Sequence, residues 1–262
     1  MNSAAEHSRN WSFSRWQRYF DENGANLQAI PWEQDHPLSD AERHAIRSSI
    51  AIFQLGESSE GRHFRDLAQR WCAARGEYDY LPALESFIAE ENRHARDLAS
   101  FMEGQSIPCQ KAHWTDSIFR VLRKAFNLEL EVTVLICAEL VARVYYRVLR
   151  DATESAPLRG ICRQILHDET FHVYFQTATL ARIRQGRHTR LRNLAWRGFY
   201  AATLLVVWHG HHRVFRKAGC GFRKFWADCW SELILAIRLC KTSPSVSAHA
   251  KPETRPSSNL QA

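Results

Sequence analysis

The sequence predicts an all-α protein: a four-helix bundle with additional helices before and after it. Four segments between residues 39 and 185 repeat apolar residues at alternating spacings of three and four, which places those residues on one face of a helix. No segment shows a convincing strand alternation. Each apolar stripe is interrupted near its middle by Glu or His, and a buried carboxylate is costly unless something pairs with it. These interruptions indicate a polar site inside the bundle.

The composition fits a globular domain that folds in water. Of the 262 residues, 45% are hydrophobic and 24% are charged. Met1–Asn10 does not resemble a signal peptide, and the longest uncharged apolar run, Gly198–Trp208, is shorter than the roughly 20 residues that span a bilayer. Seven cysteines without a Cys-x-x-Cys pair are typical of a reducing compartment. We therefore expect a cytoplasmic protein.

Residues 1–38 are predicted to form an N-terminal arm. Residues 1–10 are polar and are expected to be disordered. The stretch WSFSRWQRYF, residues 11–20, predicts a short aromatic helix docked on the main body. The stretch that follows, DENGANLQAIPWEQDHP, predicts a loop because it is rich in turn-forming residues.

Residues 39–185 are predicted to form the bundle. Ser39 and Glu42 make a capping box ahead of the first apolar stripe, and Pro157 suits the first turn of the last helix. The helices are expected to run from Ser39 to near Gly76, from about Asp79 to Glu103, from beyond Pro108 to Asp151, and onward from the break ATESAP.

Residues 186–242 are predicted to form a basic, aromatic helical extension, and residues 243–262 a disordered tail. Residues 181–262 carry 15 of the 35 Lys and Arg residues but only 3 of the 28 Asp and Glu residues. The favoured interpretation is one or two helices packed on the bundle with a solvated polar edge, to which His209, His211 and His212 are assigned. A peripheral contact with anionic lipid ranks second. Nucleic-acid contact ranks last because no base-reading motif is present.

Four Glu-x-x-His matches occur, whereas chance accounts for about one. They are Glu33–His36, Glu60–His63, Glu91–His94 and Glu169–His172. The first falls in a loop, and in the second His63 lies roughly 100° around the helix from the stripe centre. The other two lie on the second and fourth stripes, so both are candidates for a site.

Antiparallel helices bring two further carboxylates to the same level. Glu57 and Glu91 lie 19 and 15 residues from Gly76. Glu139 and Glu169 are equally far from the connection between their helices. At 1.5 Å per residue, each pair lies within roughly 6 Å of one height. The sequence therefore predicts a dinuclear metal site, whose expected ligands are Glu57, Glu91, His94, Glu139, Glu169 and His172.

The residue types of this set suit redox-active metals. Four carboxylates neutralise two divalent ions, and one imidazole per metal leaves coordination positions open for oxygen or peroxide. His and Glu ligands with open positions favour two iron ions, with manganese or a mixed Mn/Fe pair as alternatives. Glu90 and Asp168 each precede a motif Glu and are candidates for hydrogen bonds to the ligand imidazoles, with a solvated helix position as the alternative. Glu60 is a further candidate near the metals.

Four stretches carry a resemblance to the ferritin-like di-iron carboxylate superfamily, and to the rubrerythrin bundle in particular. They are LGESSEGRHF, IAEENRH, CAELVARVYY and LHDETFH. The resemblance covers about residues 39–185 and implies that the segment near residues 104–115 crosses the bundle. Two departures matter: the Cys-x-x-Cys motifs of a rubredoxin domain are missing, and Ala142 stands where rubrerythrins carry an extra carboxylate.

The resemblance implies a non-haem di-iron oxidoreductase that uses O2 or peroxide, with an unknown small-molecule substrate and an electron donor. A ferroxidase or peroxide-scavenging role is one alternative. The other is a non-catalytic, metal-stabilised bundle whose basic tail binds a membrane, at its inner face, or a protein. The sequence does not distinguish a monomer from a homodimer.

Overall fold

The computed structural model describes residues 8–58, 61–110, 127–185, 187 and 189–242. These residues are helical with connecting turns and contain no strand, which confirms the all-α prediction for this part of the chain. The helices are α2 (Phe13–Ala25), the 3-10 turn η1 (Trp32–Gln34), α3 (Asp40–Glu57), α4 (Arg62–Arg75), α5 (Tyr80–Gly104), α7 (Leu128–Ala152), α8 (Ala156–Arg184), α9 (Arg190–Lys217) and α10 (Phe222–Thr242). Residues 1–7 and 243–262 of the predicted disordered ends, and residues 111–115 of the predicted crossing segment, lie outside the described residues. Residues 8–10, which were also predicted to be disordered, are described, and Ser8 is buried.

Side-chain caps start the helices at the predicted positions. The Ser39 hydroxyl accepts a hydrogen bond from the Glu42 backbone N–H and begins α3. The Ser155 hydroxyl does the same for α8, with Pro157 in its first turn. Only residues 153–155 separate α7 from α8, so the two helices run antiparallel and share an extensive interface.

The segment predicted as one helix from Ser39 to Gly76 is two helices, so that prediction was wrong. α3 ends at Glu57 and α4 begins at Arg62, after Gly61 in the left-handed conformation with φ 63°. A Cβ atom on Gly61 would lie 2.6 Å from Ile88 Cδ1. Left-handed backbone and a close approach both favour glycine. Apolar periodicity continues across this break, and for that reason the sequence pattern did not show it.

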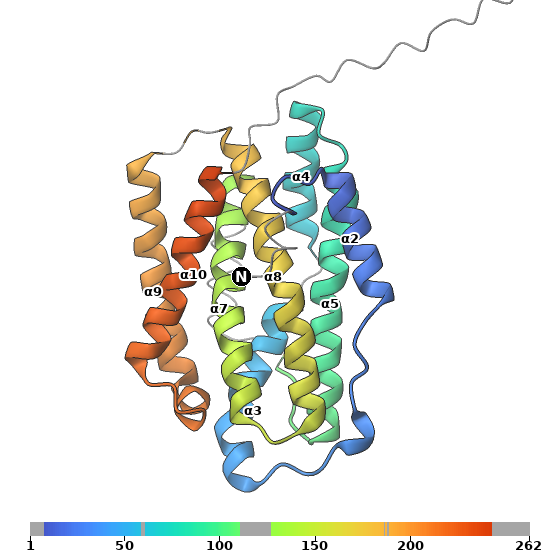
Figure 1. Ribbon diagram of the computed structural model, residues 1–262, viewed down its shortest axis with the longest axis vertical. Coiled ribbons are helices and arrows are strands. Elements are labelled where there is room, and N and C mark those ends of the chain that lie inside the picture. The colour runs from blue at the N-terminus through green and yellow to red at the C-terminus, as the bar shows by residue number, and fades with distance from the viewer. Residues whose placement is uncertain (1–7, 59–60, 111–126, 186, 188, 243–262) are drawn as a thin grey trace, which may run out of the picture.

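The central helices are flanked on both sides, as Figure 1 shows. α5 contacts α2, α3 and α8, whereas α7 contacts α8 and the extension. α9 packs on α3 and α7, and α10 packs on α7 and α8. The arm helix α2 therefore covers one side of the molecule and the extension covers another.

The arm helix is longer than predicted. Residues 21–25 were expected in a loop but continue α2 to Ala25. Phe13, Trp16 and Phe20 are buried against α5 and α8, and Trp16 is fully buried. Burial of these aromatic rings outweighs the turn preference of Asn23 and Gly24. The extra turn matters because it carries Asn23 to the candidate site.

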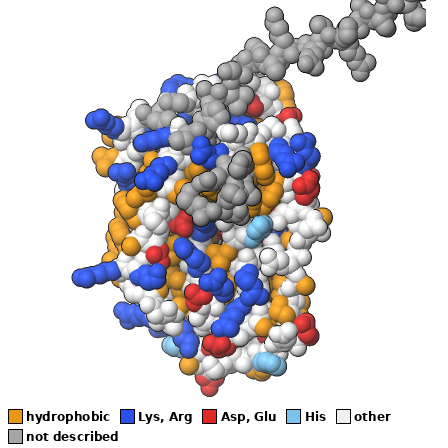
Figure 2. Space-filling view, in the orientation of Figure 1, with side chains coloured by type: hydrophobic (Ala, Val, Ile, Leu, Met, Phe, Trp, Pro, Cys, Tyr) orange, Lys and Arg blue, Asp and Glu red, His pale blue; other side chains and the backbone are white. Residues whose placement is uncertain are grey.

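The extension forms two helices, within the predicted range. α9 buries a face that includes Trp196, Tyr200 and Phe215, while most of its Arg and Lys residues are exposed. Figure 2 shows Lys and Arg side chains on the side of the molecule where α9 and α10 lie. Within the described chain, no helix combines the length and the apolarity needed to cross a bilayer.

Candidate metal centre

The six predicted ligands come together in the interior. They form two overlapping groups in which one ligand atom per residue lies within 4.8 Å of the others: Glu57, Glu91, His94 and Glu169, and Glu91, Glu139, Glu169 and His172. Glu57 ends α3, Glu139 lies on α7, and α5 and α8 each contribute a Glu and a His three residues apart. Both imidazoles are fully buried, and Glu91 is the most exposed member, with 16% of its side chain accessible. Glu91 and Glu169 belong to both groups, as residues that bridge two ions would.

Both imidazoles point Nδ1 at the carboxylates. His94 Nδ1 lies 3.8 Å from Glu57 Oε2 and 3.8 Å from Glu169 Oε1. His172 Nδ1 lies 3.6 Å from Glu139 Oε2 and 3.7 Å from Glu169 Oε2. These distances are too long for hydrogen bonds and leave room for an ion between the donors.

The buried polar atoms of this cluster fit a metal. Nδ1 of both histidines, Glu91 Oε1 and Glu169 Oε2 are buried and have no hydrogen-bond partner. His172 Nδ1 lies 3.0 Å from Glu91 Oε1, but the angles are not those of a hydrogen bond. Buried polar atoms without partners are costly, and these four lie in the two overlapping groups of ligand atoms. A pair of divalent cations would satisfy all four.

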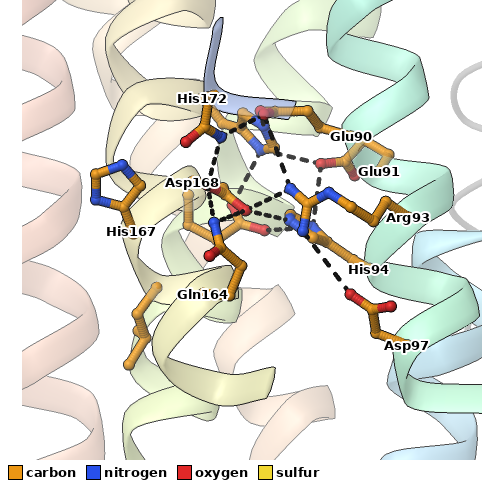
Figure 3. A network of polar contacts seen from close by, with 12 residues as sticks. Glu90, Glu91, Arg93, His94, Asp97, Gln164, His167, Asp168 and His172 are labelled. Atoms are coloured by element: carbon orange, nitrogen blue, oxygen red, sulfur yellow. Dashed lines mark hydrogen bonds and ion pairs between the residues drawn. The ribbon is translucent and has the colours of Figure 1, made fainter. Parts of the chain in front are cut away.

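The opposite imidazole nitrogens are held by carboxylates of the facing helix, as Figure 3 shows. His94 Nε2 lies 3.0 Å from Asp168 Oδ2 on α8, and His172 Nε2 lies 3.0 Å from Glu90 Oε2 on α5. A proton on each Nε2 leaves the Nδ1 lone pair free for a metal. The acidic residue that precedes each Glu-x-x-His motif therefore orients the histidine of the other motif.

Three residues that the sequence did not single out complete this outer layer. The Arg93 guanidinium donates to Asp168 Oδ2 at 2.6 Å and is largely buried. The Asn23 amide on α2 donates to both Glu90 and Asp168, and the Gln164 amide donates to Asp168. Asn23 fell in a predicted loop, so only its place in the fold brings it here. The four-residue spacing of Gln164 and Asp168 was a signal the sequence did contain.

A tyrosine holds the ligand at the end of α3. The Tyr146 hydroxyl donates to Glu57 Oε1 at 2.6 Å, and both residues are buried. Tyr146 lies seven residues after Glu139 on the same apolar stripe of α7. The stripe pattern placed Tyr146 in the interior but did not reveal the hydrogen bond of its hydroxyl to Glu57. The bond fixes one oxygen of Glu57 and turns the other toward His94.

Crowding of acids shifts the pKa of the cluster. Burial, together with the charge of Glu57, raises the pKa of Glu91 to about 7, although His172 opposes the shift. Burial also raises the pKa of Glu139 and Glu169. Burial disfavours charge on His94 and His172, but the surrounding carboxylates outweigh it and raise the pKa of both. The metal-free cluster therefore retains protons that a bound cation would displace.

A cavity of about 310 Å³ reaches the cluster between α3, α7 and α9. Glu57, Glu91, Glu139 and Glu169 line its buried inner end. Ala142 of α7 also lines it. The cavity thus connects the carboxylates with the outside of the protein.

The remaining candidate residues lie away from the cluster or outside the residues that the structure describes. Glu60 lies outside the described residues, and Glu33 lies on the turn η1, distant in the chain from any site residue. His209 is exposed, in keeping with the predicted polar edge. His211 is not on that edge: it is buried, and its Nδ1 lies 2.7 Å from the Ser49 hydroxyl. Helix α9 turns His211 toward α3, which charge patterning does not reveal.

Comparisons with protein-family models, with curated proteins and with solved structures find no match to this chain.

Proposed function

We propose that this protein is a non-haem di-iron oxidoreductase that uses O2 or peroxide. In this proposal α3 with α4, α5, α7 and α8 form a ferritin-like four-helix bundle around the metals. One observation carries the proposal: two buried imidazoles each direct an unpartnered Nδ1 atom at three carboxylates, and two of these, Glu91 and Glu169, are common to both. This is the ligand inventory of dinuclear sites in helical bundles.

Different residues of the chain would hold the ions, orient the histidines and exclude water. His94 with Glu57 would hold one ion, His172 with Glu139 the other, and Glu91 and Glu169 would be shared between the two. Iron, when bound, supplies the one-electron chemistry that oxygen or peroxide reduction needs. Glu90 and Asp168 keep the protons on Nε2 and hold the rings in place. The buried apolar residues around the cluster exclude water from the reacting atoms.

Two other functions use the same geometry. In a ferroxidase, iron is the substrate and leaves the site after oxidation. In a metal-stabilised bundle without activity, zinc or another ion holds the helices together and the basic extension binds a partner. Manganese or a mixed Mn/Fe pair would fit the same donors. The cavity that ends at the carboxylates favours an enzyme with an organic substrate over both alternatives.

Metal analysis of the purified protein tests the proposal. The wild-type protein is expected to bind two iron ions, to show a ferric absorption band, and to consume O2 after reduction. Glu169→Ala removes a ligand of both ions and is expected to lose at least one iron. Glu154→Ala, with 86% of its side chain exposed, is the control. A Glu169→Ala variant that holds two irons as well as the parent does would refute the site.

A further inference from the structure

The extension forms one wall of the cavity that leads to the cluster. Thr203, Val206, Val207 and Gly210 of α9 line the cavity opposite residues of α3 and α7. Gly210 and Ala138 are exposed, whereas at the other end Glu57, Glu139 and Glu169 are buried and Glu91 has 16% of its side chain accessible. The cavity therefore opens beside α9 and runs inward to the candidate metal centre.

The chemistry of the wall is mainly apolar. Between the mouth and the carboxylates lie side chains such as Ile52, Phe53, Leu135, Val141 and Val207. Among the lining residues of the described chain, none is Lys or Arg, although this protein has 35 of them. The formal charges on the wall come from the acids at the inner end. The wall also carries the imidazoles of His209 and His211 on α9, but an anionic group beside the apolar side chains would meet no lysine or arginine of the described residues, and burying an unpaired charge is costly.

The shape fits a small molecule rather than an ion path. A volume of about 310 Å³ lies within the range of small-molecule sites, which are mostly apolar with a few polar groups. A route for hydrated iron would need carboxylates along its length to replace water, and the outer wall has apolar side chains instead. The transfer of an apolar molecule from water to such a wall is favourable in free energy.

We infer that this cavity binds the substrate of the proposed oxidoreductase, and that the substrate is a neutral, largely hydrocarbon molecule. This inference rests on the proposed function, because only a metal centre at the inner end makes the occupant a substrate. The role of the extension follows: α9 completes the substrate site. The reacting carbon of the occupant lies toward Glu91 and Glu169, and its other end lies beside α9.

Two probes of equal chain length test the substrate class. Titration calorimetry on the iron-loaded protein measures binding of 1-octanol and of 1-octanesulfonate, which carries a permanent negative charge. We expect 1-octanol to bind and 1-octanesulfonate to bind at least tenfold more weakly. Iron content is measured on the same samples, so that loss of the metal and loss of the probe are seen separately.

Variants on α9 locate the bound probe. Gly210→Phe adds a ring to the cavity wall at a position where a new Cβ meets no atom within 4 Å. Gly198→Phe is the matched control, because Gly198 is also an exposed glycine of α9, has equal room, and does not line the cavity. Val206→Phe is a second filling variant from the same wall. We expect both filling variants to weaken 1-octanol binding at least tenfold and the control to match the wild-type protein.

The outcomes separate the two claims. The inference is overturned if 1-octanesulfonate binds as tightly as 1-octanol, or if both filling variants bind 1-octanol like the wild-type protein while iron is retained. In that case the metal centre stands and the substrate class is wrong. A wild-type protein that holds no iron overturns the proposed function itself, whatever 1-octanol does.

Discussion

Single side chains at the candidate centre act through charge and hydrogen bonds that can be removed one at a time. Asp168 accepts from Arg93, from Gln164 and from Asn23, and it faces His94 Nε2. Its pKa is lowered, since His94 and Arg93 together outweigh the effect of burial. Asp168 is therefore ionised at neutral pH, and a substitution by asparagine would remove its negative charge.

Asp168→Asn is expected to reduce metal affinity by about 10- to 100-fold, the usual effect of losing a hydrogen-bond partner of a ligand histidine. It also leaves the Arg93 charge buried with weaker compensation, so the free energy of unfolding should fall by about 3 kcal/mol. Competitive chelator titration and urea unfolding measure the two effects. Asp97→Asn is the control, because Asp97 lies 3.8 Å from Arg93 but does not contact an imidazole. Equal metal affinity in both variants would contradict this role for Asp168.

Tyr146→Phe removes the hydroxyl that donates to Glu57. A hydrogen bond to a charged group contributes about 1.5–3 kcal/mol, so unfolding free energy should fall by that amount. One of the two metal ions should also bind more weakly, since Glu57 belongs to only one ligand group. Tyr145→Phe is the matched control: the Tyr145 hydroxyl accepts from Ser49 and does not touch the cluster. Stepwise iron titration should show two unequal affinities in Tyr146→Phe alone.

At the scale of an element, the break between α3 and α4 places Glu57 at the end of a helix. Glu57 is the last residue of α3, and the chain turns through Gly61 before α4 begins. A continuous helix would have kept Glu57 inside a rigid stripe. The break instead places it at a helix end, where the Tyr146 hydroxyl orients it.

Gly61→Ala is expected to destabilise the protein by about 1–2 kcal/mol from the left-handed backbone alone. The contact with Ile88 adds to this cost, because a Cβ atom would lie 2.6 Å from Ile88 Cδ1. Gly56→Ala, in helix α3 with no atom near the new Cβ, should be neutral or stabilising by up to about 1 kcal/mol. Adding Ile88→Val should restore part of the loss in Gly61→Ala, as thermal unfolding of the double variant would show. No recovery would mean that backbone strain alone is responsible.

For the whole molecule, the candidate centre joins helices from most of the chain, so a bound metal should stabilise the fold globally. Removing metal with a chelator is expected to lower the melting temperature. At a free metal concentration of 100 times Kd, each site contributes about 2.7 kcal/mol. Calorimetric melts of the wild-type protein with and without iron measure the difference. Glu169→Ala should show a smaller difference or none, and an equal shift in that variant would place the metal elsewhere.

Much of this architecture follows from the sequence. Apolar spacing of three and four predicted helices between residues 39 and 185, because a stripe on one face of a helix must be buried. The capping box at Ser39 and the proline at position 157 marked helix starts by local chemistry. The six Glu and His residues were found because each interrupts an apolar stripe, and similar distances from a turn placed the carboxylates of each helix pair at nearly the same height. These signals are local or periodic, so they survive in a linear sequence.

Contacts between distant segments were decided only by the tertiary structure. Asn23 reaches Glu90 and Asp168 because aromatic burial extends α2 through a stretch that reads as a loop. At Gly61, in the break between α3 and α4, the side chain of Ile88, 27 positions later, leaves little room for a Cβ atom. α9 turns His211 inward and closes a cavity over carboxylates of four other helices. Each depends on packing between residues far apart in the chain, and such packing leaves no period or spacing in the sequence to read.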